Sequence, residues 1–310
     1  MAKKEFKAES KRLLDLMINS IYTHKEIFLR EIISNASDAI DKLCYKSLTD
    51  ENVGLKREDF RITIHADPDG RTLTVSDNGI GMDESELENN LGVIASSGTY
   101  QFRQEVGKDS EDVDIIGQFG VGFYSAFMVA DQITVITKKY GGSQAYRWES
   151  DGADGYTVTP CGKETVGTDI IMHIKPDEGE ETYGEFLQEY TLRSLVKKYS
   201  DYIRWPIRME VSKSRKKEDS PEDKPEYESY KEEETLNSMV PLWQRKKSDV
   251  SQEEYDKFYQ EKFNDFTAPQ SVITVSAEGQ VSYKALLYIP SRPPFDYYSA
   301  DYERGLGVTL

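Results

Sequence analysis

The chain has 310 residues, of which 37% are hydrophobic and 31% charged, and this length is enough for one large domain or two ordinary ones. Its formal net charge is −17, so its surface repels phosphate backbones and disfavours broad DNA or RNA binding, although a local site for one nucleotide is compatible with it. Two cysteines, no signal-type segment at the start and no apolar run of the roughly 18 residues that a membrane helix needs predict a cytoplasmic protein without a disulfide framework or membrane span.

The first third of the chain alternates between helical and strand patterns. Apolar residues at helical spacing predict a helix over residues 10–22 and a longer one over 23–48. Strand alternation around a Pro-Asp-Gly turn predicts a β-hairpin over 61–77. A further helix is expected over 83–95.

The next segments complete one domain. Residues 96–123 have little periodicity, and long loops in compact domains are usually functional. A short apolar helix over 122–130, four strands between 131 and 175, a helix over 181–203 and a strand over 206–212 follow. These elements predict an α+β fold, a two-layer sandwich of a largely antiparallel sheet with helices on one face.

A change of composition divides the chain after this first domain, residues 1–212. Residues 213–234 are charged and lack core-forming residues, which indicates a solvated linker or an extended hairpin. A helix over 242–263 and paired strands over 271–290 come next. Because residues 235–310 make a poor core by themselves, we expect them to be the beginning of a second α/β domain.

Several common chemical motifs are missing. No G-x-x-x-x-G-K-[ST] phosphate loop, no H-E-x-x-H segment and no G-x-S-x-G elbow occurs in the sequence. The three histidines and two cysteines show no zinc-ligand spacing. These absences disfavour P-loop nucleotide hydrolases, zinc enzymes and serine hydrolases of the α/β type.

Polar residues share one face of the second predicted helix. Glu31, Asn35 and Asp38 stand at positions i, i+4 and i+7, and Lys42 extends the row. A carboxylate one turn from an amide suits a water-activating base beside a Mg²⁺ ligand. A solvated helix face would carry the same residue types.

Three further segments are compatible with nucleotide binding. In DNGIGM, residues 77–82, an aspartate ends a strand and two glycines let the backbone approach a ligand, and the carboxylate would select the adenine amine; a plain Asx turn is the alternative. In GQFGVGFYSAF, residues 117–127, glycines lead into a helix N-terminus that suits phosphates; the alternative is a hinge. Thr168 could offer a hydroxyl, or simply favour a strand.

The order of these segments is more informative than any one of them. It resembles the Bergerat-fold ATP-binding superfamily, shared by gyrase-type topoisomerases, mismatch-repair ATPases, sensor histidine kinases and heat-shock protein 90 chaperones. HKEIFLREIISNASDAIDKL, SDNGIGM and IGQFGVGFYSAFMVAD are most similar to the heat-shock protein 90 family. The resemblance covers residues 5–310, and the short linker is similar to that of bacterial members.

The resemblance implies roles for individual residues. Glu31 would be the general base that orients the attacking water, and Asn35 would hold Mg²⁺. Asp77 would accept from adenine, with Thr168 supporting it through a water. The resemblance implies further contacts to ATP or ADP: Asp38 and Lys42 line the site, Gly81 and Met82 lie at the adenine, Asn90 and Phe123 lie near the ribose and phosphates, and Gly117, Gly120, Val121 and Gly122 are backbone donors. Residues 95–122 would form a lid over the bound nucleotide.

The resemblance also implies the function: an ATP-hydrolysing domain of a chaperone whose lid closure and dimer cycling assist unfolded or partly folded client proteins. Family members hydrolyse ATP with the help of an arginine that would lie beyond Leu310, and they dimerise through a C-terminal domain. Slow turnover and a monomer or weak dimer are therefore expected of these 310 residues. The alternatives are a topoisomerase or mismatch-repair ATPase domain with DNA as partner, and a nucleotide-binding module without catalysis.

Overall fold

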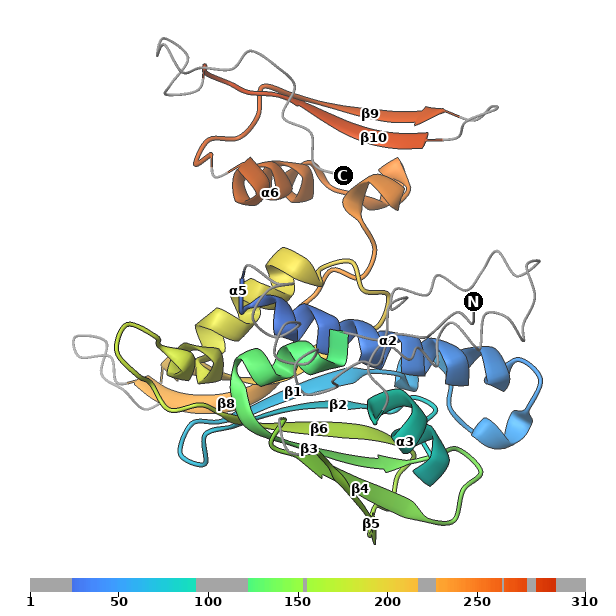
Figure 1. Cartoon of the computed structure of the whole chain (residues 1–310). Coiled ribbons are helices and arrows are strands. Elements are labelled where there is room, and N and C mark those ends of the chain that lie inside the picture. The colour runs from blue at the N-terminus through green and yellow to red at the C-terminus, as the bar shows by residue number, and fades with distance from the viewer. Residues whose placement is uncertain are drawn as a thin grey trace, which may run out of the picture. The chain divides into compact units, whose positions relative to one another are not determined.

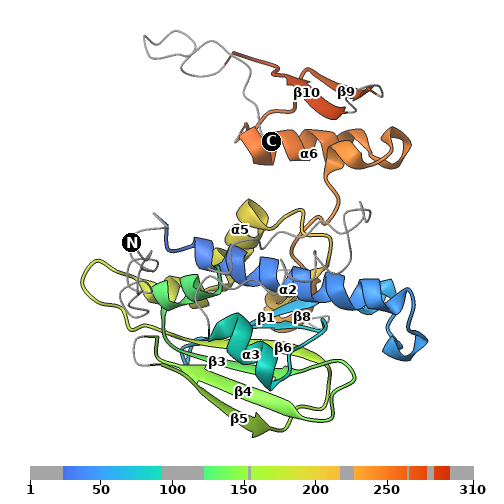
Figure 2. The ribbon, with the colours of Figure 1, turned by 45° about the vertical axis from the view of Figure 1, so that its right-hand side comes forward.

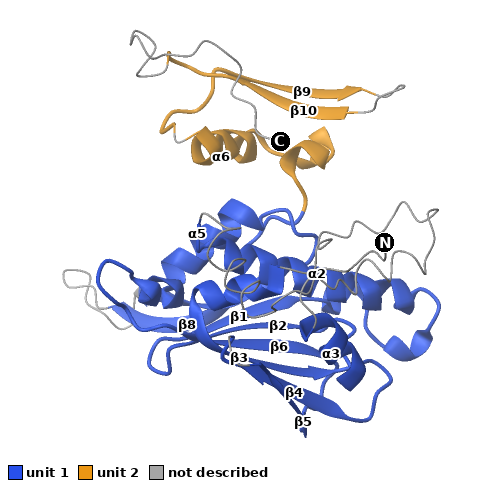
Figure 3. Ribbon diagram, in the orientation of Figure 1, with its two compact units in different colours: residues 1–239 blue, residues 240–310 orange. Residues whose placement is uncertain are grey.

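The computed structural model describes residues 24–92, 122–152, 155–216, 227–263, 265–277 and 283–293. The chain divides into two compact units, Met1–Met239 and Val240–Leu310 (Figure 3). The helix expected over 10–22 and all but the last two residues of the 96–123 segment lie outside the described residues.

An eight-stranded sheet in the order β5-β4-β3-β6-β2-β1-β7-β8 forms the base of the first unit. Neighbouring strands are antiparallel except β1 and β7, which run parallel. The predicted hairpin is confirmed as β1 and β2. The strands are β1 (Ile62–Asp67), β2 (Thr72–Asp77), β3 (Ala130–Lys138), β4 (Ala145–Ser150), β5 (Thr157–Cys161), β6 (Gly167–Ile174), β7 (Ile207–Lys216) and β8 (Tyr227–Thr235).

Helices α2 and α5 lie over the same face of this sheet (Figures 1 and 2). The predicted two-layer α/β sandwich is thereby confirmed. The helices of this unit are α2 (Ile27–Ser47), α3 (Glu84–Leu91), α5 (Glu189–Tyr199) and the short 3₁₀ helices η2 (Glu51–Val53), η3 (Arg57–Asp59), η4 (Gly122–Met128) and η5 (Tyr183–Leu187). Among the described helices of the chain, none is long and apolar enough to cross a membrane.

The core of the first unit lies between α2 and the sheet. One stripe of α2 is apolar at helical spacing. Each Leu, Ile or Phe side chain of this stripe contributes about 1.5–3 kcal/mol when it leaves water. The buried residues of this stripe are Phe28, Leu29, Ile32, Ile33, Ala36, Ile40 and Leu43. Burial of this stripe orients the helix, so the row Glu31, Asn35 and Asp38 runs along its flank.

Two predicted helices are shorter than expected. The 181–203 segment is split into η5 and α5, because Gln188 between them is extended and Gly184 lowers the helix propensity of the first part. In the 242–263 segment the α-helix begins only at Gln252. There Ser251 and Glu254 form a reciprocal cap, with Ser251 N–H donating to Glu254 Oε2 at 2.9 Å.

Charged residues cover the strands at the end of the first unit. The predicted linker or hairpin, 213–234, contributes the end of β7 and most of β8 in its described part. Cross-strand pairs such as Arg208 with Glu233, 3.0 Å apart, and Lys231 with Glu210, 2.8 Å apart, line these strands. Such exposed pairs contribute little stability each, but charge on an edge strand discourages pairing with other chains.

The second unit is a small α/β assembly. It contains α6 (Gln252–Phe263), the antiparallel pair β9 (Ser271–Ala277) and β10 (Tyr283–Ile289), and the 3₁₀ turns η6 (Leu242–Gln244) and η7 (Lys247–Asp249). Its buried cluster is formed by Leu242, Val250 and Tyr255, with Tyr288 packed against it.

Candidate functional site

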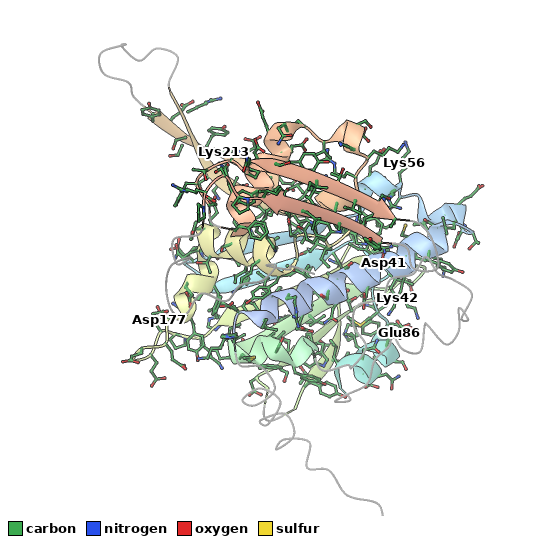
Figure 4. All side chains as sticks on the ribbon, turned by 90° about the horizontal axis from the view of Figure 1, so that it is seen from above. Asp41, Lys42, Lys56, Glu86, Asp177 and Lys213 are labelled. Carbon is green, nitrogen blue, oxygen red and sulfur yellow. The ribbon has the colours of Figure 1, made fainter. Side chains whose placement is uncertain are left out.

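The flank of α2 presents acidic, amide and amine groups within about three turns. The Glu31 side chain is 20% exposed, Asn35 is half-buried, and Asp38 is 2% exposed. Burial lowers the pKa of the Lys42 ammonium, while the charges of Asp38 and Glu86 partly offset this. Lys42 lies on the side of α2 toward Glu86 of α3 (Figure 4). The helix thus brings together all four of its predicted site residues.

The carboxylate of Glu31 lies between a guanidinium group and a glycine. Arg30 donates to Oε1 from Nε at 3.0 Å and from Nη2 at 2.5 Å. On the other side, a Cβ atom added to Gly122 would lie only 2.4 Å from Glu31 Oε2. The first residue of η4 therefore leaves no room for a side chain beside this carboxylate.

Replacing Gly122 with alanine is expected to push the Glu31 carboxylate away from its position. If Glu31 acts on a reacting water, a displacement of this kind lowers kcat about tenfold or more, since misplacement by about 1 Å is costly. Steady-state ATP hydrolysis measures the effect. The matched control is Gly162→Ala, because a Cβ there meets nothing within 4 Å. Equal turnover in the two variants would contradict the close approach.

Asp77 ends β2 as a buried carboxylate, 9% exposed. Burial raises its pKa to about 7, and the charge of Asp169 adds to this. The Gly79 N–H, which donates to Asp77 Oδ1 at 2.8 Å, and the Lys163 ammonium act in the opposite direction. A buried acceptor with few protein donors is suited to receive a hydrogen bond from a ligand.

The loop after Asp77 lies close to both α2 and β3. A Cβ on Gly79 would be 2.5 Å from the Ala39 carbonyl carbon of α2, and Ile80 N–H donates to the Ala39 carbonyl at 3.0 Å. Gly81 has a φ of +64°, and a Cβ there would be 2.0 Å from the Lys138 carbonyl oxygen. Glycine is required at both positions by the close approach of protein backbone, whereas the DNGIGM pattern was interpreted as room for a ligand.

Thr137 of β3 is a residue that the sequence reasoning missed. Its hydroxyl accepts from Met82 N–H at 2.9 Å and lies 3.0 Å from the Thr168 hydroxyl, and both threonines are buried. Thr168 also stands opposite Asp77 in the sheet. The sequence signal for Thr137 was weak, because β3 carries polar residues at several other positions, such as Gln132 and Thr134. Thr137 therefore joins Thr168 to the glycine loop.

The structure describes only some of the other predicted contact residues. Asn90 on α3 lies near the loop, with Nδ2 3.8 Å from Met82 Sδ. Phe123 on η4 is buried in the core, edge-on to Trp148 at 5.5 Å. The predicted phosphate donors Gly117, Gly120 and Val121, and residues 95–121 of the predicted lid, lie outside the described residues.

Comparison with known proteins shows which family has this arrangement of segments. A family model described as "Histidine kinase-, DNA gyrase B-, and HSP90-like ATPase" matches residues 22–161, and one described as "Hsp90 protein" matches 185–235 and 221–306. The chain is 57% identical over 306 residues to the chaperone protein HtpG of Clostridium botulinum (strain Langeland / NCTC 10281 / Type F). The chain belongs to the heat-shock protein 90 family. The matching C. perfringens protein (strain 13 / Type A), also named chaperone protein HtpG, is 56% identical.

Both alignments cover 99% of this chain and 48% of the relative, so the chain spans about half the length of the curated relatives it matches. The match that covers α2, the Asp77 loop and η4 is to the ATPase model that histidine kinases, DNA gyrase B and heat-shock protein 90 share. The Hsp90 model and the similarity to the two HtpG proteins favour an ATPase domain of the heat-shock protein 90 type over the topoisomerase or mismatch-repair alternative.

The magnesium site expected in this family member is consistent with the side chains on α2. Mg²⁺ usually keeps several waters and binds one or two protein groups together with substrate phosphates. Among the described residues there is no group of three or more His, Cys, Asp or Glu side chains that could hold a metal. The half-buried amide oxygen of Asn35 is a hard donor, one turn from Glu31. A single amide oxygen from Asn35 fits a Mg²⁺ ion whose other ligands would be nucleotide phosphates and waters.

Proposed function

We propose that the chain binds ATP or ADP with Mg²⁺ along α2 and hydrolyses ATP, as the ATPase domain of a molecular chaperone. The observation that supports this most directly is the convergence of two segments on one helix. Gly122 of η4 abuts Glu31, and Gly79 of the loop after Asp77 abuts Ala39, two turns further along α2. A potential base and a potential adenine acceptor are thereby held on one rigid scaffold.

Each group has a distinct role in this proposal. Asp77 accepts the adenine amino group, and Thr168, tied to Thr137, supports it. Glu31 orients the attacking water and accepts its proton. Asn35 holds Mg²⁺, which offsets the charge on the phosphates when it is bound.

Slow hydrolysis is part of the proposal. The ion pair with Arg30, at 2.5 Å, occupies Oε1 of Glu31 and holds this oxygen away from a reacting water. Turnover therefore requires Glu31 to leave Arg30 or to use its other oxygen.

The affinity for nucleotide is expected to depend on pH through Asp77. Its pKa is about 7, and the ionised carboxylate accepts from the adenine amine more strongly than the neutral carboxyl group does, so protonation below pH 7 weakens this contact. Affinity should weaken by up to roughly tenfold between pH 8 and pH 6. Calorimetry with adenosine measures this without interference from phosphate ionisation. A constant adenosine affinity over this range would contradict the assignment of Asp77.

Calorimetric titration with ADP and Mg²⁺ tests the proposed nucleotide site. Saturable heat with one site per chain is expected, and omission of Mg²⁺ should weaken binding because Asn35 then has no ion to share with the phosphates. Absence of binding at millimolar ADP would refute the proposal.

The chaperone role is proposed from the family. Client proteins that are unfolded or partly folded, a homodimer of the longer protein and a cytoplasmic location follow from it. Cys44 and Cys161 are unpaired, which suits a reducing compartment. Suppression of aggregation of a heat-denatured test protein by a longer homologous chain, dependent on ATP, is the corresponding measurement.

A further inference from the structure

One residue from a distant part of the chain binds the last carbonyl groups of η4. Lys175, just after β6, donates from Nζ to the carbonyl oxygens of Phe127 and Met128 at 2.8 and 3.2 Å. Its backbone N–H donates to the Val129 carbonyl at 2.9 Å. The final carbonyls of a helix lack partners within it, and a cation offsets their partial negative charge. Lys175 therefore caps the C-terminal end of η4.

The backbone of Lys175 is itself fixed. Arg71, in the turn between β1 and β2, donates from Nε to the Ile174 carbonyl at 3.2 Å and from Nη2 to the Lys175 carbonyl. The same guanidinium lies 3.5 Å from Asp177, which is labelled at the edge of the molecule in Figure 4. The cap thus projects from a segment that is tied to the sheet.

A charged cluster connects this cap to the start of α2. The Tyr183 ring lies 4.5 Å from the Lys25 ammonium and 5.7 Å from that of Lys175. Lys25 donates to Glu181 at 2.5 Å and to the Tyr183 hydroxyl at 2.9 Å. Burial, and then the charge of Lys25, lower the pKa of Lys175, while Glu181 and Asp131 raise it. The negative charges of Glu181 and Asp131 offset the repulsion between the ammonium groups of Lys25 and Lys175.

The two ends of η4 are held by residues from different parts of the chain. The first residue, Gly122, lies against the carboxylate of Glu31, and the last carbonyls lie on Lys175. The residues between them, Phe123 to Met128, are all buried. A short, buried helix moves as one body, so a shift at its capped end is passed to Gly122.

We propose that Lys175 is a positioning residue of the ATPase site, which sets the place of the Gly122 backbone beside Glu31 by anchoring the far end of η4. The inference rests on the proposed ATPase function. It assigns no contact between Lys175 and nucleotide. Its effect should therefore fall on turnover and leave adenine binding by Asp77 intact.

The substitution Lys175→Met keeps the length of the side chain and removes its charge and its donors. We expect ATP turnover to fall about tenfold while the ADP dissociation constant stays within about twofold of the wild type. Lys175→Arg should restore most of the turnover. Lys198→Met is the matched control, because that lysine also lies near the start of α2 but bonds to Glu26. Amide hydrogen exchange at residues 122–129 should accelerate in Lys175→Met only.

Several results would overturn the inference. One is unchanged ATP turnover in Lys175→Met, and another is unchanged amide hydrogen exchange at residues 122–129. A third is an equal loss of ADP affinity and turnover, because this would indicate general loosening of the domain. If the wild type did not hydrolyse ATP, or if its hydrolysis did not depend on Glu31, both the proposed function and this inference would be refuted. Normal hydrolysis in both wild type and Lys175→Met refutes the inference alone.

Discussion

Asp77→Asn is expected to weaken ADP binding about 100-fold. The Gly79 N–H fixes one side-chain oxygen of Asp77, so the amide group of asparagine would point its NH₂ toward the adenine amine. Two donors then face each other where a charged acceptor contributed about 1.5–3 kcal/mol. Calorimetry with ADP and Mg²⁺ measures the loss.

The same substitution should stabilise the nucleotide-free protein. Burial raises the pKa of Asp77 to about 7, well above its value of about 3.9 in an unfolded chain, so the folded protein binds the proton more tightly. The ionised carboxylate therefore opposes folding at neutral pH, and this cost fades as the pH falls from 7 toward 4. Asparagine removes it, by about 1–3 kcal/mol at neutral pH.

A control substitution separates these effects from general damage. Asp131→Asn changes an aspartate on β3 that is 46% exposed and paired with His173. It should leave both ADP affinity and unfolding free energy nearly unchanged. Undiminished ADP binding by Asp77→Asn would place the adenine elsewhere and overturn the arrangement of the whole site.

Glu31→Gln should lower ATP turnover by about 10² to 10⁴-fold, the usual contribution of a general base. Glutamine has nearly the same size, so the contact with Gly122 is kept and the ability to accept a proton is lost. The dissociation constant of ADP should change less than about threefold, because Asp77 and Asn35 are untouched. Single-turnover hydrolysis and calorimetry on the same preparation separate the two quantities.

Glu26→Gln is the control for this result. Glu26 precedes α2, and its carboxylate accepts from Lys198 and Tyr199 of α5, away from Glu31. Its turnover should stay within about twofold of the wild type. If Glu31→Gln hydrolysed ATP at the wild-type rate, the chain would be a nucleotide-binding module, as the second alternative from the sequence holds.

The sequence alone predicted those parts of the fold and site that depend on local patterns of residue spacing and on turn residues. The spacing of Glu31, Asn35 and Asp38 required them to share a helix face, and the positive φ of Gly81 follows from its place in a tight turn. The hairpin of β1 and β2 was visible because alternation and a turn signal lie within one short segment. Each of these rests on contacts between residues close together in the chain.

Tertiary structure decided what depends on residues distant in sequence. Local patterns carry no information about strand order, so the parallel pairing of β1 with β7 could not be read from them. The raised pKa of Asp77, the tie between Thr137 and Thr168, and the capping of η4 by Lys175 all arise from burial or from partners at least 30 residues away. Periodicity determines which face of an element is polar, but only packing determines which other groups that face meets.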